Sequence, residues 1–133
     1  MAFSVRLRAD IWENFGGCMA PVNAFLNYIG IETLGLRMKK ICENANALAN
    51  ALDKLPNIEV NYLTLPQHPF HECVNKLLNG YGGGILTFRV GSKERAFKII
   101  NSLKYAMIAS NIGDLRTLVI HPASTLYLHT KIS

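Results

Sequence analysis

The sequence has 133 residues, of which half are apolar and 17% are charged, and its formal net charge is +5. These values suit one ordinary folded domain and argue against wholesale disorder. No apolar run reaches the roughly 20 residues of a membrane span, and the basic residues form no tract, so we expect neither a membrane partner nor a nucleic-acid partner. The three cysteines, Cys18, Cys42 and Cys73, have no paired spacing, which favours a reduced, cytoplasmic protein.

The first part of the chain is predicted to form two helices. Apolar side chains four residues apart, with charged residues between them, indicate an amphipathic helix over residues 3–15, and those charges argue against a signal peptide. Gly16 and Gly17 should end this helix. A second helix is expected to begin near Pro21, since proline is tolerated in a first turn, and Gly30 is a point at which it bends or breaks.

One long apolar stripe is the clearest local signal in the sequence. Its members are spaced four and three residues apart in turn, as on one face of a helix: Leu34, Met38, Ile41, Ala45, Leu48, Leu52 and Leu55. Pro56 should end that helix. Two interpretations are open. The stripe is either a coiled-coil seam between chains or, as is commoner at this length, a face that packs against a sheet or helix of the same protein.

The remainder of the chain alternates between short strands and short helices. Helices are predicted over residues 72–78 and after Ser92, which can cap the second of them, and strands over 58–62, 85–90, 106–109 and 117–120. We therefore expect an α+β fold in which long helices lead into a small antiparallel or mixed sheet with helices on one face. A helical segment, residues 1–56, would precede a partial α+β domain, residues 57–133, and together they would form one compact unit.

Three features suggest known sites without matching them. His68 and His71 lie near Cys73, but Pro69 separates the histidines and no second ligand pair follows, so no metal is expected. The glycine-rich run at 80–84 precedes a strand and lacks phosphate-loop spacing; its expected role is to let the backbone pass where side chains would clash. A cysteine–histidine nucleophile pair stays open, because such pairs meet in space, although nothing marks any cysteine as activated.

Three stretches of the sequence resemble the pyridoxal-phosphate enzymes of Cys/Met metabolism. They are MAPVNAFLNYIGIETLGLRMKKICENANALANAL (19–52), LPQHPFHECVNKLLNGYGGGILTFRV (65–90) and SNIGDLRTLVIHPAST (110–125). Within them stand a Gly-x-Glu-Thr-Leu-x-x-Arg run at 30–37, an Asn-Ile-Gly-Asp run at 111–114 and a His-Pro-Ala-Ser run at 121–124. The nearest branch is that of the O-acetylhomoserine sulfhydrylases (O-acetylhomoserine aminocarboxypropyltransferases), and the resemblance extends from about Phe3 to Thr125.

The resemblance implies that the chain is a fragment, namely the junction helices and most of the C-terminal domain of a fold type I enzyme. In the family, a larger domain holds pyridoxal phosphate through a lysine in a Ser-x-Thr-Lys-like context. No lysine here has that context, so we expect no catalytic residue, no cofactor-binding residue and no covalently bound cofactor in this chain. The family's arginine for the substrate carboxylate comes after the His-Pro-Ala-Ser run, and Arg116 lies in the wrong motif to replace it.

Asn111 is the candidate substrate-binding residue. In related family members a small polar residue just before the glycine turn contacts the substrate carboxylate, and Asn111 stands at that position. An amide N–H can donate to a carboxylate. The alternative is that Asn111 only shapes the turn, with Gly113 supplying a positive φ. The weaker candidates are Thr117, Ser124 and Thr125.

The implied parent is a homo-oligomeric, cytoplasmic enzyme of methionine biosynthesis that acts on a small molecule. It would convert O-acetyl-L-homoserine and sulfide to homocysteine and acetate, and the fragment alone should be inactive. Sister reactions on the same scaffold, cystathionine γ-synthase or γ-lyase, fit less well, because those branches have a run more like Ser-Leu-Gly-Gly where Asn-Ile-Gly-Asp stands here. A third interpretation is a non-enzymatic truncated module that only self-associates.

Overall fold

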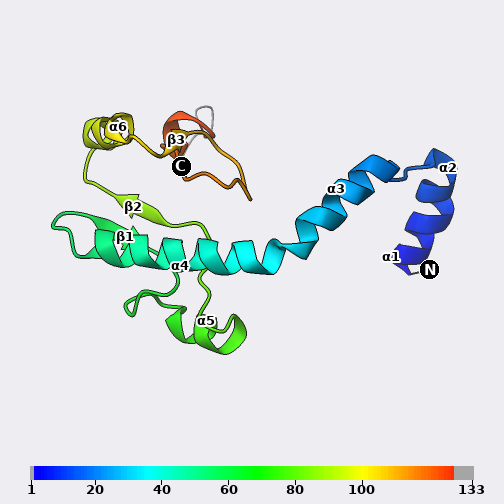
Figure 1. Ribbon diagram of the computed structural model, residues 1–133, viewed down its shortest axis with the longest axis horizontal. Coiled ribbons are helices and arrows are strands. Elements are labelled where there is room, and N and C mark those ends of the chain that lie inside the picture. The colour runs from blue at the N-terminus through cyan, green and yellow to red at the C-terminus, as the bar shows by residue number, and fades with distance from the viewer. Residues whose placement is uncertain (1, 128–133) are drawn as a thin grey trace. The chain divides into compact units, whose positions relative to one another are not determined.

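The computed structural model describes residues 2–127 and shows an α+β chain (Figure 1), as predicted. Its elements, in chain order, are α1 (Phe3–Arg6), the π-helix η1 (Leu7–Trp12), α2 (Glu13–Phe15), α3 (Pro21–Glu32), α4 (Leu34–Asp53), β1 (Glu59–Asn61), α5 (His71–Leu77), β2 (Thr87–Arg89), α6 (Lys93–Ser102), β3 (Met107–Ile108), β4 (Leu118–Val119) and the 3₁₀ turn η2 (Pro122–Ser124). Within the described residues, no helix combines the length and apolarity needed to cross a membrane.

The chain divides into two compact units, Met1–Lys40 and Ile41–Ser133. The division falls inside α4 and not at residue 56, where the sequence suggested a boundary. The reason is that α4 beyond Lys40 packs against residues that follow β1. The organisation into a helical segment, residues 1–56, and a partial α+β domain, residues 57–133, stays a prediction.

The first unit is built from helices alone. α1, η1 and α2 follow one another without a gap and end at Gly16, which has a φ of 62°. α3 begins at Pro21, as predicted, and Gly30 does not break it; the interruption before α4 comes at Thr33. Among residues 2–40, only Gly30 and Arg37 are half-buried, and all the others are exposed.

Arg37 fastens the junction between α3 and α4. Its Nη2 donates to the carbonyl oxygen of Gly30 at 2.6 Å, and its Nε donates to the Thr33 hydroxyl at 3.2 Å. Carbonyl groups in the last turn of a helix lack partners within the helix, and the guanidinium supplies one. The two hydrogen bonds from Arg37 thus hold the Gly-x-Glu-Thr-Leu-x-x-Arg run in the conformation that joins α3 to α4.

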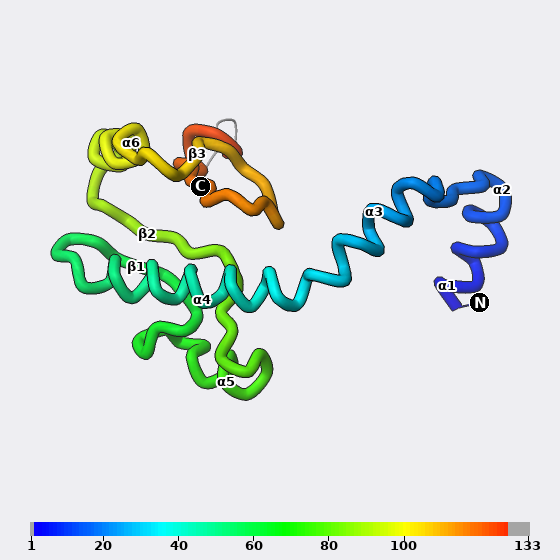
Figure 2. Tube along the Cα trace, in the orientation of Figure 1, coloured from blue at the N-terminus to red at the C-terminus, as the bar shows by residue number. Residues whose placement is uncertain are grey.

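The second unit has a core centred on α4 and the segment after β1. Ala45 and Ala49 of α4 pack with Tyr62 and Leu65, whose exposed fractions are only 2% and 1%, and Val60 and Leu86 complete the cluster. The green part of the trace in Figure 2 shows the chain leaving α4, passing through β1 and α5, and returning to β2. Small side chains on α4 let the Tyr62 ring approach the helix closely.

The predicted stripe on α4 is buried only in part, since Ala45 is buried and Ile41 and Leu52 are half-buried. Leu48 is 45% exposed, and Leu34, Met38 and Leu55 are exposed too, whereas Cys42 and Ala49 are buried. Leu55 also lies beyond the end of the helix at Asp53. The residues that pack on α4 determine which of its faces is buried. Tyr62 and Leu65 pack closely on the helix, and the small alanine side chains leave room for them.

The glycine-rich run has the role that the sequence predicted for it. The Tyr62 hydroxyl donates to the carbonyl oxygen of Gly83 at 2.8 Å. A Cβ atom on Gly82 would stand 2.8 Å from Cζ of Tyr62 and Cγ2 of Thr64, and one on Gly84 would overlap the Ile41 side chain. Glycine is required because the backbone passes directly over these side chains.

Two short ladders complete the second unit. β1 and β2 pair antiparallel, with Val60 opposite Phe88, and β3 and β4 pair parallel, with Met107 opposite Leu118. Both kinds of pairing were expected, and among the described residues they occur in two separate two-stranded sheets. Between the ladders, the Ser92 hydroxyl accepts a hydrogen bond from the Arg95 amide at 3.2 Å, so the predicted helix cap is confirmed.

Candidate functional site

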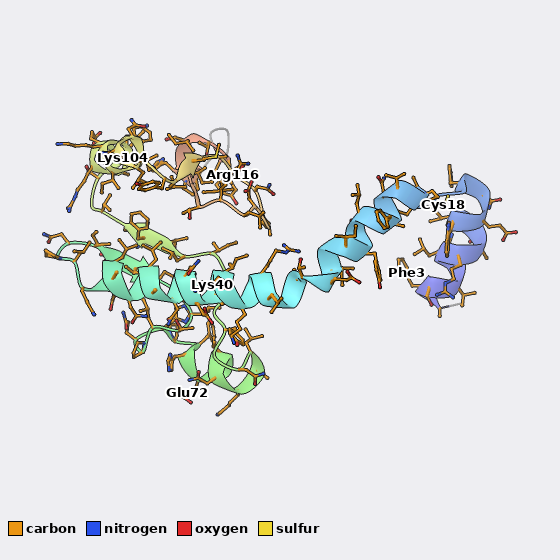
Figure 3. All side chains as sticks on the ribbon, in the orientation of Figure 1. Phe3, Cys18, Lys40, Glu72, Lys104 and Arg116 are labelled. Carbon is orange, nitrogen blue, oxygen red and sulfur yellow. The ribbon has the colours of Figure 1, made fainter. Side chains whose placement is uncertain are left out.

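The loop between β3 and β4 is organised by one carboxylate, that of Asp114. Its Oδ1 accepts from the main-chain N–H of Arg116 at 2.9 Å and from Nε of Arg116 at 3.1 Å, and its Oδ2 accepts from Nη2 of Arg116 at 3.0 Å. The Asp114 side chain is 15% exposed and that of Arg116, labelled in Figure 3, is 62% exposed. Gly113, the residue before Asp114, has a φ of 93°, which confirms the predicted positive φ.

These contacts hold the pKa of Asp114 at about 2, below its ordinary value of 3.8. The main cause is the hydrogen bond from the Arg116 side chain, followed by that from its main-chain N–H; a hydrogen bond from the Asn111 side chain acts in the same direction. Asp114 in turn raises the pKa of Arg116. The loop therefore contains a fixed ion pair at neutral pH, with charge-assisted hydrogen bonds in a forked arrangement.

Asn111, the candidate substrate-binding residue, lies at the start of this loop and is exposed. Its side chain contributes to the lowered pKa of Asp114. Because the same side chain is also open to solvent, it can contact a ligand without prior unfolding of the loop. Contact with a substrate and a role in the turn alone both stay predictions for Asn111.

The weaker candidates mostly have structural partners. Ser124 Oγ lies 2.9 Å from Nδ1 of His121, and Thr125 Oγ1 donates to the His121 carbonyl oxygen at 3.1 Å. The His121 ring stands edge-on to that of Phe97 in α6, with centroids 5.2 Å apart. These contacts close the turn that follows β4 and attach it to α6. Thr117 is exposed, and its carbonyl oxygen accepts from the Met107 amide at 2.9 Å.

The sequence analysis missed the role of Asp114. A usable signal was present, since an aspartate after a glycine turn commonly accepts from the backbone N–H two residues on, and here that residue is an arginine. The Asp-x-Arg pair at 114–116 is therefore a local signal for an ion pair in this loop.

His68 and His71 have hydrogen-bond partners close to them in sequence. His68 Nδ1 accepts from the Phe70 amide at 3.1 Å, and Nε2 of His71 lies 3.2 Å from Nδ2 of Asn75. Over residues 2–127, no group of three or more His, Cys, Asp or Glu side chains is placed to hold a metal ion. Cys42 is buried in the α4 core, and Cys18 and Cys73 are exposed. The expected absence of a metal stays a prediction.

One open hollow of about 330 Å³ lies on the β1–β2 ladder. Its lining contains an ion pair, Arg89 to Glu59 at 3.7 Å, in which both side chains are well exposed. The lining residues are Glu59, Val60, Asn61, Thr87, Phe88 and Arg89. They include none of the candidate site residues and no lysine, cysteine or histidine.

The fold and the motifs define a class of protein: the chain belongs to the Cys/Met metabolism PLP-dependent enzyme family, whose model matches residues 3–132. Within it, the chain is similar to O-acetyl-L-homoserine sulfhydrylase 1 of Thermus thermophilus, with 40% identity over 135 residues that cover 100% of this chain and 32% of the relative. It is also similar to the homocysteine synthase of Schizosaccharomyces pombe, with 38% identity over 96% of this chain and 30% of the relative. The family resemblance seen in the sequence is confirmed.

A solved structure gives the same result in three dimensions. The O-acetylhomoserine (thiol)-lyase structure from Campylobacter jejuni superimposes with a TM-score of 0.86 at 35% identity, over 98% of this chain and 31% of that one. It contains N'-pyridoxyl-lysine-5'-monophosphate at position 205. The chain thus spans about a third of the length of the relatives it matches.

The described residues do not fit a covalent pyridoxal phosphate site. Such a site needs a lysine that reaches the cofactor in a sheltered position. Every lysine among residues 2–127 is exposed, and none borders the hollow on the β1–β2 ladder. Lys131 lies outside the described residues.

Proposed function

We propose that this chain is part of an O-acetylhomoserine sulfhydrylase, which replaces the acetate of O-acetyl-L-homoserine with sulfide to give homocysteine and acetate. The observation that carries the proposal is the 40% identity to a sulfhydrylase along the whole chain. The Asn-Ile-Gly-Asp run at 111–114, folded into the turn at Gly113, supports it. Pyridoxal phosphate, held by other parts of the enzyme, would supply the electron withdrawal that makes the substrate carbons reactive.

The reaction can be tested on the full-length polypeptide that carries this sequence. Supplied with pyridoxal phosphate, O-acetyl-L-homoserine and sulfide, it should release homocysteine and acetate in equal amounts. Cystathionine formation and cystathionine cleavage, the sister reactions, should be at least about tenfold slower in kcat/KM, a difference of about 1.4 kcal/mol in transition-state stabilisation. Fast cystathionine chemistry without homocysteine formation would assign the chain to the sister branch.

The 133-residue chain alone should show neither reaction. After addition of pyridoxal phosphate and borohydride, we expect scattered, substoichiometric labelling of exposed lysines, because none of the described ones is sheltered. One dominant lysine adduct at full stoichiometry would contradict this expectation.

Within the site, we propose that Asn111 donates a hydrogen bond to the α-carboxylate of the amino-acid substrate. Its exposure and its position at the Gly113 turn support this role. A hydrogen bond to a charged group contributes about 1.5–3 kcal/mol, so Asn111→Ala in the full-length enzyme should lower kcat/KM for O-acetylhomoserine roughly ten- to a hundredfold. A value within twofold of wild type would leave Asn111 as a turn residue only.

We also propose that the chain self-associates, in agreement with a homo-oligomeric parent enzyme. The apolar side chains of α1 to α3, all exposed in the described residues, support this proposal. Location in the cytoplasm fits its unpaired cysteines and metabolic relatives. The absence of a basic tract fits a protein with no nucleic-acid partner.

A further inference from the structure

A single residue, Thr33, interrupts what would otherwise be one long helix. α3 ends at Glu32 and α4 begins at Leu34, and Thr33 between them has a φ of −100° and a ψ of 0°. A residue inside an α-helix has a φ of about −63° and a ψ of about −42°. Rotations of roughly 40° about two main-chain bonds of Thr33 therefore distinguish this interrupted form from an unbroken form.

Two different donors can use one acceptor at this junction, the carbonyl oxygen of Gly30. In an unbroken helix it would accept from the main-chain N–H four residues on, which is that of Leu34. Here it accepts from Nη2 of Arg37 at 2.6 Å. The guanidinium thus supplies the carbonyl with a donor at the point where the helix is interrupted.

The Arg37 side chain is held in place by a second contact. Its Nε donates to the Thr33 hydroxyl at 3.2 Å. A planar guanidinium can make both contacts at once, whereas a lysine has only a single nitrogen. Among residues 2–40, only Gly30 and Arg37 are half-buried, so this pair is less open to water than its surroundings. Its charge-assisted hydrogen bond is therefore the strongest local contact that favours the interrupted form.

Helix propensity around the junction is low on both sides. Gly30 and Gly35 flank it, and glycine is a poor helix former. Apart from its chain neighbours and its own helix backbone, a Cβ atom at either glycine would meet nothing within 4 Å. Local hydrogen bonds, and not packing around the two glycines, therefore decide between the interrupted and unbroken forms.

We propose that the α3–α4 junction is a two-state hinge and that Arg37 holds it in the interrupted form. Without the guanidinium, the Leu34 N–H donates to the Gly30 carbonyl oxygen, Thr33 becomes helical, and one helix extends over residues 21–53. The state of the hinge sets the direction in which α3 leaves α4, the helix that carries the core of the second unit. This role is independent of the proposed reaction.

NMR of the 133-residue chain, below the concentration at which it associates, tests the hinge. In Arg37→Ala the main-chain secondary ¹³C shifts of Thr33 and Leu34 should move toward helical values. The ratio of unbroken to interrupted form should rise about tenfold or more, the factor that corresponds to one hydrogen bond to a charged group. Lys39→Ala is the matched control, because it removes one positive charge from an exposed position of the same helix. There the shifts should stay in place.

A second variant, Thr33→Val, separates the two contacts of Arg37. It keeps the branched shape of residue 33 but removes the acceptor of Nε, while the Gly30 carbonyl keeps its donor. The shifts of Leu34 should therefore move in the same direction as in Arg37→Ala, but less. Unchanged shifts in Arg37→Ala would overturn the proposal. A movement toward coil values would overturn it too, because the helix ends would then fray instead of merging, and so would a larger movement in Thr33→Val than in Arg37→Ala.

Discussion

Residues 2–40 and residues 41–127 differ in where they put their apolar side chains. In the first region no side chain is buried, and even the aromatic ring of Phe15 is 84% exposed. In the second, Tyr62 and Leu65 are buried against Ala45 and Ala49 of α4, and Val74 of α5 is buried too. Both regions form regular helices, so helix formation does not distinguish them. The difference lies in whether the chain contains a partner for the helix face.

This difference supports the proposal that another polypeptide surface covers the first region. Fully burying a large apolar side chain stabilises a protein by roughly 1.5–3 kcal/mol, and α1 to α3 expose many of them. Exposed apolar side chains that gather in one patch are typical of an interface. Because the chain spans about a third of its relatives, the cover would come from the remaining polypeptide or from a second copy of the chain.

The largest expected effect of a point change is in the second region. Leu65→Ala should destabilise the chain by about 2–5 kcal/mol, because it opens a cavity against Ala49 and Tyr62. The matched change Leu36→Ala, on an exposed site of α4, should cost less than about 0.5 kcal/mol. Urea unfolding of both variants at low protein concentration checks the pair. Equal losses in the free energy of unfolding for the two variants would contradict the claim that only the second region has a core of its own.

Self-association should depend on the first region. Phe25→Glu, on the exposed apolar surface of α3, should raise the dissociation constant of the oligomer at least about tenfold, which corresponds to about 1.4 kcal/mol. Asn27→Glu is the control, because it adds the same charge to α3 about 200° around the helix. Sedimentation over a concentration series measures both. A wild-type chain that is monomeric at high micromolar concentration would contradict the proposal.

A smaller effect should appear at low pH in the second region. The pKa of Asp114 is about 2 in the fold, below the ordinary 3.8, so its ionised form favours the folded loop. That contribution is complete above the ordinary pKa and is lost as the pH falls through about 2. In Arg116→Ala the carboxyl should titrate closer to 3.8. Carboxyl ¹³C NMR measures the midpoint; an unchanged midpoint would mean that Arg116 is not the cause.

Local rules predicted the parts of the fold that depend on neighbouring residues in sequence. Ser92 has the side chain and position of a helix cap, and it caps α6. Pro21 marks the start of α3. The glycine-rich run was predicted to pass close to other groups, although Tyr62, Thr64 and Ile41 could not be named in advance. Such signals are local, and tertiary packing did not override them.

Features that depend on distant residues were harder to predict. The predicted stripe placed Leu48 on the buried face of α4, but Leu48 is exposed. Ala49 is the most buried position of the helix instead, because Tyr62 and Leu65 pack against it. At the site, Asn111 could be named only through the family resemblance, because an exposed asparagine in a turn carries no chemical signal of its own.

Hydrogen exchange tests the central claim, that the first region needs a cover and the second holds its own core. It should be measured on the 133-residue chain, below the concentration at which it associates, and on the full-length polypeptide. Amides of α4 from Cys42 to Ala49 and of β1 should exchange slowly in both. Amides of α1 to α3 should exchange fast in the isolated chain and slowly in the full-length protein. Slow exchange of α1 to α3 in the isolated monomer, or fast exchange in the full-length protein, would contradict the account.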